Sequence, residues 1–338
     1  MAEKLNIAVV GATGLVGETM LDILAAREFP ADQVHAIGSK RSFGKSVEFG
    51  RRELPVEMLS DFDFSKMDLA FFSAGAAISA EYAEKAAAAG CVVIDNTSCF
   101  RDDPDVPLIV PEVNENEIRN YRQRNLIANP NCSTIQLTVV LKPLHDAAGL
   151  RSVRVSTYQS VSGAGRAKLE ELARQSADLL AGNGRKDGNP AIAFNVWPQI
   201  DEFEDNGYTR EEMKIVRETR RLLGLPELPV SATAVRVPVF FGHAEAVAIS
   251  TEQPLSAGEA RDLLAQAPGV EVMDIPRDKV FPTPALDTPN TDVVFVGRVR
   301  EDLVGEHGLN LWIVADNVRK GGALNSIQIA EILVKAYL

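Results

Sequence analysis

The chain has 338 residues, of which 46% are hydrophobic and 24% charged, a composition typical of a folded, water-soluble protein and not of a disordered one. Thirty-five basic and 47 acidic side chains leave a net charge of -12, which argues against nucleic acid as a partner. No apolar run is long enough for a transmembrane helix, and the opening apolar run is too short for a signal peptide. We therefore expect a cytoplasmic protein with no membrane partner.

The cysteines and the length limit the architecture further. Cys91, Cys99 and Cys132 are irregularly spaced, and neither C-x-x-C nor H-E-x-x-H occurs, so we expect reduced thiols and no bound metal. The length exceeds that of most single domains. It predicts two packed units with separate cores.

The first half of the chain is typical of an α/β fold. Between Leu5 and Leu126, short apolar or β-branched runs alternate with helical patterns, as in βαβ units whose parallel sheet is covered on both faces. The expected helices span 15–27 and 78–89. The expected strands span 5–10, 34–38, 68–74, 91–95 and 125–129.

The pattern changes after Ser133, where longer strands with alternating polarity predict a mixed or antiparallel sheet. These strands are expected at 152–161, 230–241, 245–251, 291–300 and 309–316. Helices are expected at 165–180, 209–223, 256–266 and 322–338. The last helix could return to pack on the first domain, and the glycine-rich segment 182–190 predicts a surface loop.

A glycine motif opens the first expected helix directly after the first strand. In Gly11-Ala-Thr-Gly14-Leu-Val-Gly17, Gly11 permits a tight turn, Gly14 lets the backbone approach a pyrophosphate, and Gly17 allows close helix packing. The helix N-terminus attracts phosphate charge. This context favours a Rossmann-type dinucleotide site over a plain strand-to-helix turn.

The end of the second expected strand indicates which dinucleotide is bound. An NAD site usually carries an acidic residue there, to bind the ribose 2′-hydroxyl. Here the strand ends in Gly38-Ser39-Lys40-Arg41-Ser42, which offers hydroxyls and cations instead. A guanidinium suits a 2′-phosphate, so NADP is favoured, although an exposed basic turn would look the same.

Cys132 is the best candidate for a nucleophile. It follows Asn129-Pro130-Asn131 and precedes a helical run, so its sulfur lies at a helix N-terminus, where a thiolate is favoured over a thiol. Cys91 lies in an apolar strand and is expected to be structural. Cys99, in a polar loop close to Arg101, is the competing nucleophile.

His243 is the best candidate for an acid or base among the four histidines. His35, His145 and His307 are expected on a strand, on a helix and in an acidic loop. His243 follows Gly242 in a turn, and its imidazole could exchange protons with a bound intermediate. A hydrogen-bonded structural histidine is the alternative.

Three cations could form an anion site if the fold brings them together. Arg101, Lys214 and Arg236 are expected in a loop, a helix and a strand. From spacing alone, however, Lys214 is better explained by a helical ion pair with Glu211 or Glu218.

Taken together, the chain resembles bacterial aspartate-β-semialdehyde dehydrogenases from Ile7 to the last helix. The resemblance is carried, in the family's order, by GATGLVG, SKRSFGK, NTSCFR, NPNCST, YQSVSGAGR, EEMKIVRET, RVPVFFGHAE and DNVRKGGALN. It implies reversible reduction of L-aspartyl 4-phosphate by NADPH to L-aspartate 4-semialdehyde and phosphate, in lysine, methionine and threonine synthesis. It also implies a homodimer, an NADP-binding domain of residues 1–132 completed by 318–338, and a catalytic and dimerisation domain of residues 133–317 with an α+β fold.

The resemblance also implies roles for individual residues. Catalytic roles fall to Cys132 as acyl-thioester nucleophile, His243 as acid/base and Gln159 as the group that orients the substrate. Substrate binding is implied for Arg101, Lys214 and Asn131 at the phosphate, Arg236 at the carboxylate and Glu211 at the amine. Cofactor binding is implied for Gly11, Thr13, Gly14, Leu15, Val16, Gly17, Ser39, Arg41, Ser42, Ser162, Gly163 and Asn317. The family often has cysteine where this chain has Ala234, which concerns a supporting contact only.

Two other functions compete with this one. N-acetyl-γ-glutamyl-phosphate reductases use the same thioester chemistry, but they carry glycine before the nucleophile, where this chain has Asn131. A non-catalytic, NADP-binding dimeric relative is the alternative from another class. The presence of both Cys132 and His243 argues against it.

Overall fold

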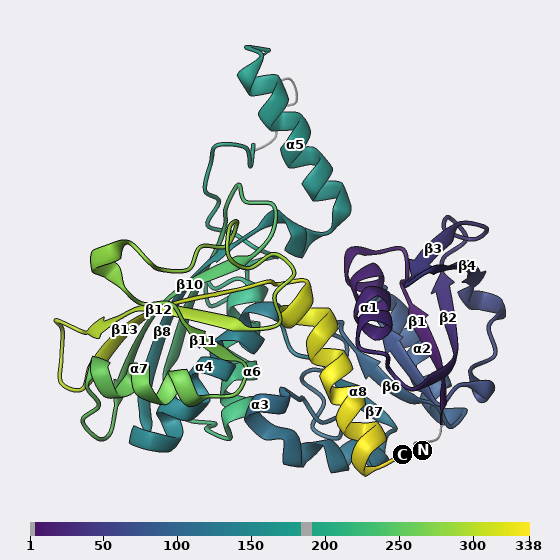
Figure 1. Ribbon diagram of the computed structural model, residues 1–338, viewed down its shortest axis with the longest axis horizontal. Helices are drawn as coiled ribbons and strands as arrows, with labels where there is room; N and C mark the ends of the chain where they lie inside the picture. Colours follow the sequence, from purple (N-terminus) through teal and green to yellow (C-terminus); the bar gives the residue numbers. More distant parts are fainter. Residues whose placement is uncertain (1–3, 184–190) are drawn as a thin grey trace. The chain divides into compact units, whose positions relative to one another are not determined.

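The structure, a computed structural model, describes residues 4–183 and 191–338, so most of the expected loop 182–190 lies outside the described residues. Contacts divide the chain into a first unit, Met1–Asn131 with Gly322–Leu338, and a second unit, Cys132–Gly321 (Figure 1). Compared with the expected boundaries, Cys132 and residues 318–321 move to the second unit. Helix α4 (Cys132–Ala148) packs there from its first residue, and the Gly321 N–H donates to the Asp316 carbonyl oxygen.

The first unit contains a seven-stranded sheet of order β3-β4-β2-β1-β5-β6-β7. All neighbouring strands are parallel except β3 and β4. The strands are β1 (Leu5–Val10), β2 (Ala31–Gly38), β3 (Ser46–Phe49), β4 (Arg52–Met58), β5 (Leu69–Phe72), β6 (Val92–Asp95) and β7 (Leu126–Ala128). Every residue of β5 and β6 is buried, as in a parallel sheet covered on both faces.

The helices of the first unit complete its core. They are α1 (Leu15–Ala26), α2 (Ala76–Ala88), α3 (Pro111–Asn114) and α8 (Leu324–Ala336), with short 3-10 helices η1 (Leu59–Asp61), η2 (Phe64–Lys66) and η3 (Glu115–Gln123). Apolar residues of α8 pack in one cluster with those of β1 and α1, among them Ile327, Ile7 and Leu24. An ion pair of Arg27 and Glu331 ties α8 to the end of α1, with 2.7 Å between Nε and Oε1.

The second unit contains a six-stranded mixed sheet of order β11-β12-β13-β10-β8-β9, which confirms the expected fold class. The central strand β10 is antiparallel to both β8 and β13, whereas β8 and β9 are parallel. The strands are β8 (Leu150–Gln159), β9 (Val230–Arg236), β10 (His243–Thr251), β11 (Val270–Val272), β12 (Val294–Glu301) and β13 (Gly308–Ala315).

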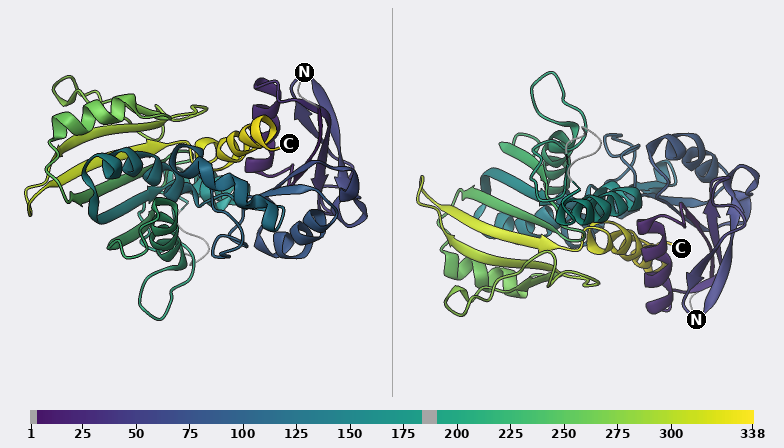
Figure 2. Two further views of the ribbon diagram at one scale, coloured as in Figure 1. Left: turned by 90° about the horizontal axis from the view of Figure 1, so that it is seen from below. Right: turned by 90° about the horizontal axis from the view of Figure 1, so that it is seen from above.

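Helices of the second unit pack on one face of this sheet (Figure 1, Figure 2). They are α4, α6 (Arg210–Leu223) and α7 (Ala257–Gln266). Helix α5 (Arg166–Leu180) extends beyond the sheet. The short helices are η4 (Val161–Ala164), η5 (Pro276–Asp278) and a π-helix, η6 (Arg319–Ala323). Along β10, His243, Glu245, Val247 and Ile249 are buried, whereas Ala246, Ala248 and Ser250 are half-buried. The first set faces α4, and the second set lies on the opposite face of the sheet.

Candidate active site

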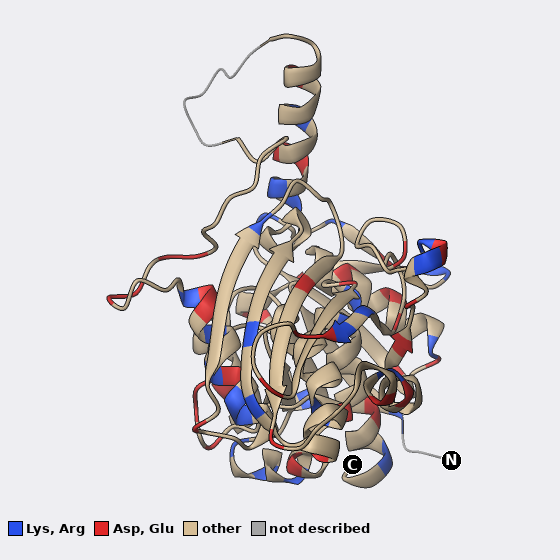
Figure 3. Cartoon of the chain, turned by 90° about the vertical axis from the view of Figure 1, so that its left-hand side faces the viewer, with Lys and Arg blue, Asp and Glu red and all other residues tan. Residues whose placement is uncertain are grey.

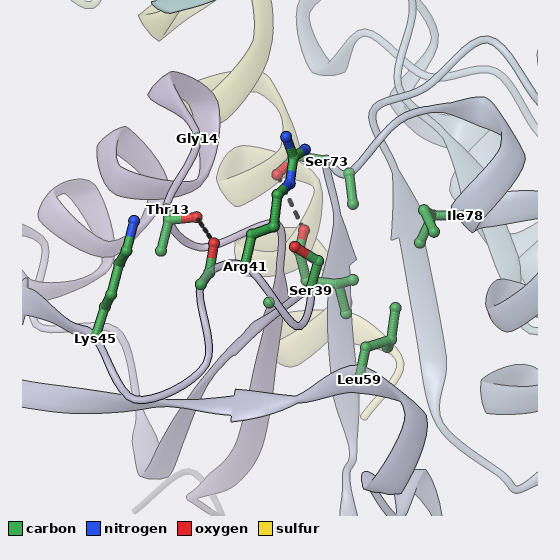
Figure 4. A pocket seen from close by; sticks show the side chains of 13 residues that line it. Thr13, Gly14, Ser39, Arg41, Lys45, Leu59, Ser73 and Ile78 are labelled. Atoms are coloured by element: carbon green, nitrogen blue, oxygen red, sulfur yellow. Dashed lines mark hydrogen bonds between the residues drawn. The ribbon is translucent and has the colours of Figure 1, made fainter.

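The glycine turn of the first unit borders a pocket of about 620 Å³ (Figure 4). Gly11 has φ +89°, a conformation that favours glycine. A Cβ on Gly17 would lie 2.3 Å from the Gly11 carbonyl oxygen, so only glycine fits at the start of α1. The pocket is lined by Val10, Gly11, Thr13, Gly14, Gly38, Ser39, Arg41, Ser42, Lys45, Leu59, Ser73, Ala74 and Ile78. Leu15 and Val16 follow as the first residues of α1.

The loop after β2 supplies the cations of this pocket. Arg41 and Lys45 both line it, and none of its lining residues is acidic (Figure 4). The hydroxyls of Thr13 and Ser42 lie 2.9 Å apart and join the loop to the glycine turn. This set of groups fits a dinucleotide with a 2′-phosphate. The sequence reasoning did not assign Lys45 to the cofactor site. Its positive charge, in the same loop as Arg41 and shortly after it in the sequence, is the signal that could have identified it.

The first turn of α4 carries Cys132, as expected, with Ser133 next to it. Gly321 supports the cysteine from behind, because a Cβ there would lie 2.9 Å from the Cys132 Cβ. Arg236, on β9, is held by a 2.6 Å hydrogen bond from its guanidinium to the Ser160 carbonyl oxygen. Burial lowers the pKa of Arg236, while the charges of Cys132 and Glu211 raise it in part. Cys132 and Glu211 therefore each lie within electrostatic range of Arg236.

His243 is fully buried at the start of β10. Its Nδ1 accepts a 3.1 Å hydrogen bond from the Ser160 N–H and lies 3.0 Å from the Ser160 hydroxyl. A backbone N–H can only donate, so the neutral ring carries its proton on Nε2. Burial, and then the charge of Arg236, hold the pKa of His243 well below its usual range, although the Gly242 backbone opposes them. Nε2 has no hydrogen-bond partner among the described residues.

The His243 imidazole and the Arg236 guanidinium both lie beside Gly163. A Cβ at Gly163 would lie 3.2 Å from both the His243 Nε2 and an Arg236 guanidinium nitrogen. The missing side chain therefore leaves room where these two groups meet. Asn317 organises the surrounding loops, because its Oδ1 accepts hydrogen bonds from the Ser160 and Ser162 hydroxyls and from the Gly242 N–H.

Helix α6 presents a second polar group of residues. Gln159 donates to Glu211 over 3.1 Å, and Lys214 lies 3.3 Å from the same carboxylate. Lys214 also pairs with Asp201 over 2.8 Å. Burial lowers the pKa of Lys214, but Glu211 and Asp201 more than offset it. The helical ion pair expected for Lys214 is thus present, and Asp201, which no motif indicated, is its second partner.

Arg101 and Asn131 belong to the first unit. Arg101 is buried, and its Nε and a terminal nitrogen each donate over 2.9 Å, to the carbonyl oxygens of Asn129 and Asn96. These contacts fix the guanidinium at the ends of β6 and β7. The phosphate-binding roles of Arg101, Asn131 and Lys214 stay predictions.

The other candidate side chains have structural surroundings. Burial raises the pKa of the Cys91 thiol to about 12, which fits the expected structural role. Burial, together with Asp95 and Glu84, also raises the pKa of Cys99. The His35 Nδ1 lies 2.6 Å from the Glu57 Oε1, so this histidine is hydrogen-bonded within the first unit. Over residues 4–183 and 191–338, no three His, Cys, Asp or Glu side chains are grouped to hold a metal ion, and no helix there is long and apolar enough to cross a membrane.

Comparison with known proteins finds relatives along the whole chain. Residues 6–121 match the family described as semialdehyde dehydrogenase, NAD binding domain, and residues 141–320 match semialdehyde dehydrogenase, dimerisation domain. Aspartate-semialdehyde dehydrogenase of Legionella pneumophila is 54% identical, with 100% of this chain and 98% of the relative covered. The crystal structure of aspartate semialdehyde dehydrogenase II complexed with ASA from Vibrio cholerae has a TM-score of 0.96 at 51% identity, with 100% of both chains covered. The Candida albicans enzyme with NADP has a TM-score of 0.76 at 25% identity, with 98% of both chains covered.

Proposed function

The chain belongs to the aspartate-semialdehyde dehydrogenase family, and we propose that it reversibly reduces L-aspartyl 4-phosphate to L-aspartate 4-semialdehyde and phosphate with NADPH. The resemblance seen in the sequence is thereby confirmed. The product of such an enzyme feeds lysine, methionine and threonine synthesis.

One observation supports the chemistry most directly. Cys132 starts a helix within range of the Arg236 charge, and the buried His243 points an unpartnered Nε2 to the space beside Gly163. A buried donor without a partner is costly unless a ligand completes it. The second unit therefore combines a nucleophile, a cation and a hydrogen-bond donor. A bound substrate could supply the acceptor that this donor lacks.

NADP fits the pocket of the first unit. Gly11, Thr13 and Gly14 would hold the pyrophosphate, and Ser39, Arg41 and Ser42, with Lys45, would hold the 2′-phosphate. When bound, NADPH supplies the hydride that reduces the acyl group. Ser162, Gly163 and Asn317 belong to the second unit, and their contacts with the cofactor stay predictions.

Cys132 carries the covalent chemistry. Its thiolate, favoured by the helix N-terminus and by Arg236, attacks the carbonyl carbon of aspartyl phosphate, and the C–S bond forms. The C–O bond to phosphate breaks, and its electron pair leaves on inorganic phosphate. After reduction of the thioester, the negatively charged thiohemiacetal oxygen re-forms the carbonyl. The C–S bond breaks and its electron pair leaves on the sulfur, which releases the aldehyde and the thiolate.

His243 acts on the oxygen that gains negative charge. Because Nδ1 is occupied by the Ser160 N–H, the proton at Nε2 is the one that His243 can offer to that oxygen. Donors fixed in a water-poor site stabilise an oxyanion by about 2.7–4 kcal/mol each. Within the acid/base role expected from the sequence, we therefore assign His243 the part of a hydrogen-bond donor through Nε2.

The two ends of the amino acid have complementary partners on different elements. The Arg236 guanidinium would hold the substrate carboxylate. The Glu211 carboxylate, which accepts a hydrogen bond from Gln159, would accept a further hydrogen bond from the substrate amine. Lys214 would contact the phosphate, and the phosphate-binding roles of Arg101 and Asn131, which belong to the first unit, stay predictions. An N-acetylated substrate lacks the amine, so the reductase alternative is disfavoured.

Replacement of Cys132 tests this function. Cys132→Ala should lower the turnover of L-aspartate 4-semialdehyde with phosphate and NADP about 10³-fold or more, because no thioester can form. NADP binding, measured by calorimetry, should stay within about twofold, since the pocket belongs to the other unit. Cys99→Ala is the matched control and should stay active. Full activity of Cys132→Ala would reject the nucleophile assignment.

The same assay separates the competing substrate. The wild-type enzyme should turn over L-aspartate 4-semialdehyde faster than N-acetyl-L-glutamate 5-semialdehyde, because Glu211 offers a carboxylate to a free amine. Faster turnover of the acetylated compound would reject the proposed substrate.

The expected homodimer is supported by the match of residues 141–320 to a dimerisation domain. We propose that the face of the second sheet opposite α4 forms the interface. The cytoplasmic location stays a prediction.

A further inference from the structure

Glu245 is a buried carboxyl group that the proposed reaction does not use. It lies on β10, two residues after His243, and its side chain is fully buried in the layer between the sheet and α4. Its neighbours across the sheet are Thr157 on β8 and Ile313 on β13, both also fully buried. Two residues along a strand span about 7 Å, so Glu245 follows His243 at that spacing on the same face of the sheet.

Two polar side chains that act on Glu245 come from the first turns of α4. Ser133 and Gln136 approach its carboxyl, and Ser133 directly follows Cys132. The approach is loose, because neither carboxyl oxygen of Glu245 and neither amide atom of Gln136 makes a hydrogen bond of regular geometry within the described part of the chain. Glu245 thus belongs to the strand of His243 and faces the helix of Cys132.

The surroundings of Glu245 favour the uncharged acid. Burial raises the pKa of this carboxyl well above its usual range, and Gln136 and Ser133 lower it only in part. The residues named around it, Thr157, Ile313, Ser133 and Gln136, carry no positive charge. A neutral carboxyl group can both donate and accept a hydrogen bond, which matches the amide of Gln136.

We propose that Glu245 is a positioning residue, whose carboxyl group fixes the first turn of α4 against β10 and so holds the Cys132 sulfur in place for His243. The proposal rests on the roles proposed above for these two residues. The nucleophile and the proton donor come from different elements, and Glu245 is attached to one and contacts the other. A small displacement of reacting groups is costly, since about 1 Å can lower a rate about 100-fold.

Two substitutions at this position separate shape from polarity. Glu245→Gln keeps the shape, the donor and the acceptor, and should keep turnover within about threefold. Glu245→Leu fills the space but removes the polar group that faces the Gln136 amide, and should lower kcat about 10- to 100-fold with KM for semialdehyde and phosphate nearly unchanged. Ile249→Val, buried on the same strand, is the matched control and should change neither parameter.

Alkylation of Cys132 by iodoacetamide, followed from pH 5 to 9, supplies a measurement that a purely structural role would not change. In Glu245→Leu the rate at pH 7 should fall about three- to tenfold, because the sulfur leaves the position that favours its thiolate. Glu245→Gln and Ile249→Val should keep the wild-type profile. Gln136→Met removes the same contact from the side of α4 and should also lower kcat about 10- to 100-fold. It tests the proposal even if Glu245→Leu does not fold.

Several results would overturn this role. Wild-type kcat and alkylation profiles in Glu245→Leu or Gln136→Met would show that no positioning occurs. Loss of activity in Glu245→Gln equal to that in Glu245→Leu would show that the carboxyl acts as an acid or a charge. Mass spectrometry identifies the alkylated residue, and inactivation through a residue other than Cys132 would reject the proposed nucleophile separately from Glu245.

Discussion

Arg236 is a partly buried cation without an ion pair among the described residues. Its hydrogen bond to the Ser160 carbonyl oxygen fixes its direction but does not neutralise its charge. Desolvation of an unpaired cation is unfavourable, so the residue is best explained by an anion that arrives with the substrate.

Loss of this guanidinium should mainly affect substrate binding. Arg236→Leu should raise KM for L-aspartate 4-semialdehyde about 10- to 150-fold, the range expected for a charge-assisted hydrogen bond of about 1.5–3 kcal/mol. Steady-state kinetics with saturating NADP and phosphate measure this change. Arg217→Leu removes an exposed arginine of α6 and should leave KM unchanged. Unchanged kinetics in Arg236→Leu would remove Arg236 from the site.

His243 should make stability depend on pH in one direction. Its imidazole stays neutral when folded, mainly because of burial and then Arg236, whereas the unfolded chain binds a proton below about pH 6.5. The unfolded state then holds more protons, so stability falls as the pH falls below about 6.5. Urea unfolding at pH 7.5 and pH 5.0 should show a larger loss in the wild type than in His243→Gln, by up to about 2 kcal/mol. Equal losses in both proteins would contradict the buried, neutral imidazole.

Sequence reasoning was most informative for residues with local signals. The Gly11 turn could be predicted because a positive φ and a close approach at Gly17 both require glycine. Asp201 and Gly321 could not be found in this way, because each acts on a residue distant in the chain, Lys214 and Cys132 respectively. Glu245 appeared in a family motif, but only its burial under α4 indicates a role.

At the scale of elements, α6 shows how local sequence places a binding group. Thr209 and Glu212 form a capping box, in which the Thr209 hydroxyl accepts from the Glu212 N–H and the Glu212 carboxylate accepts from the Thr209 N–H. The Glu212 carboxylate also accepts from the Ala234 N–H over 2.9 Å, which joins α6 to β9. Because Glu211 and Lys214 lie in these first turns, the cap fixes their position.

The two capping boxes found in the described part of the chain allow a matched test. Thr209→Ala, in the buried box of α6, and Ser256→Ala, in the exposed box of α7, should each lower the free energy of unfolding by about 0.5–2 kcal/mol. Only Thr209→Ala should also raise KM for semialdehyde, by about three- to tenfold, because α6 carries Glu211. Chemical denaturation and steady-state kinetics measure the two effects. Equal KM values in both variants would show that the α6 cap does not position the site.

The accuracy of the predicted elements follows their hydrophobic pattern. Strands β1, β5 and β6 were expected because their apolar runs are buried on both faces. Strands β3 and β4 were missed, because at the edge of the sheet residues 46–58 carry several charges and one proline. The start of α8 was placed two residues early, where the π-helix η6 precedes it.

Across the whole molecule, the face of the second sheet opposite α4, here called the open face, has no helix layer among the described residues. Helices α4, α6 and α7 pack on the other face. The open face carries small and polar residues around a pocket of about 300 Å³ and the aromatic pair Tyr158 and Trp312, whose ring centroids lie 5.5 Å apart. Figure 3 shows few charged residues along these strands. Aromatic and arginine side chains, with few lysine or acidic side chains, are typical of interfaces between copies.

A charge placed on this face should therefore separate the copies. The wild type should sediment as a dimer in analytical ultracentrifugation, whereas Ala248→Arg should raise the dissociation constant at least about 100-fold, because two desolvated arginines would meet across a twofold axis. Ala265→Arg, on the exposed side of α7, is the control and should stay dimeric. A dimer of unchanged affinity in Ala248→Arg would place the interface elsewhere, since a central residue of a sheet-to-sheet interface cannot accept a buried charge without loss of affinity.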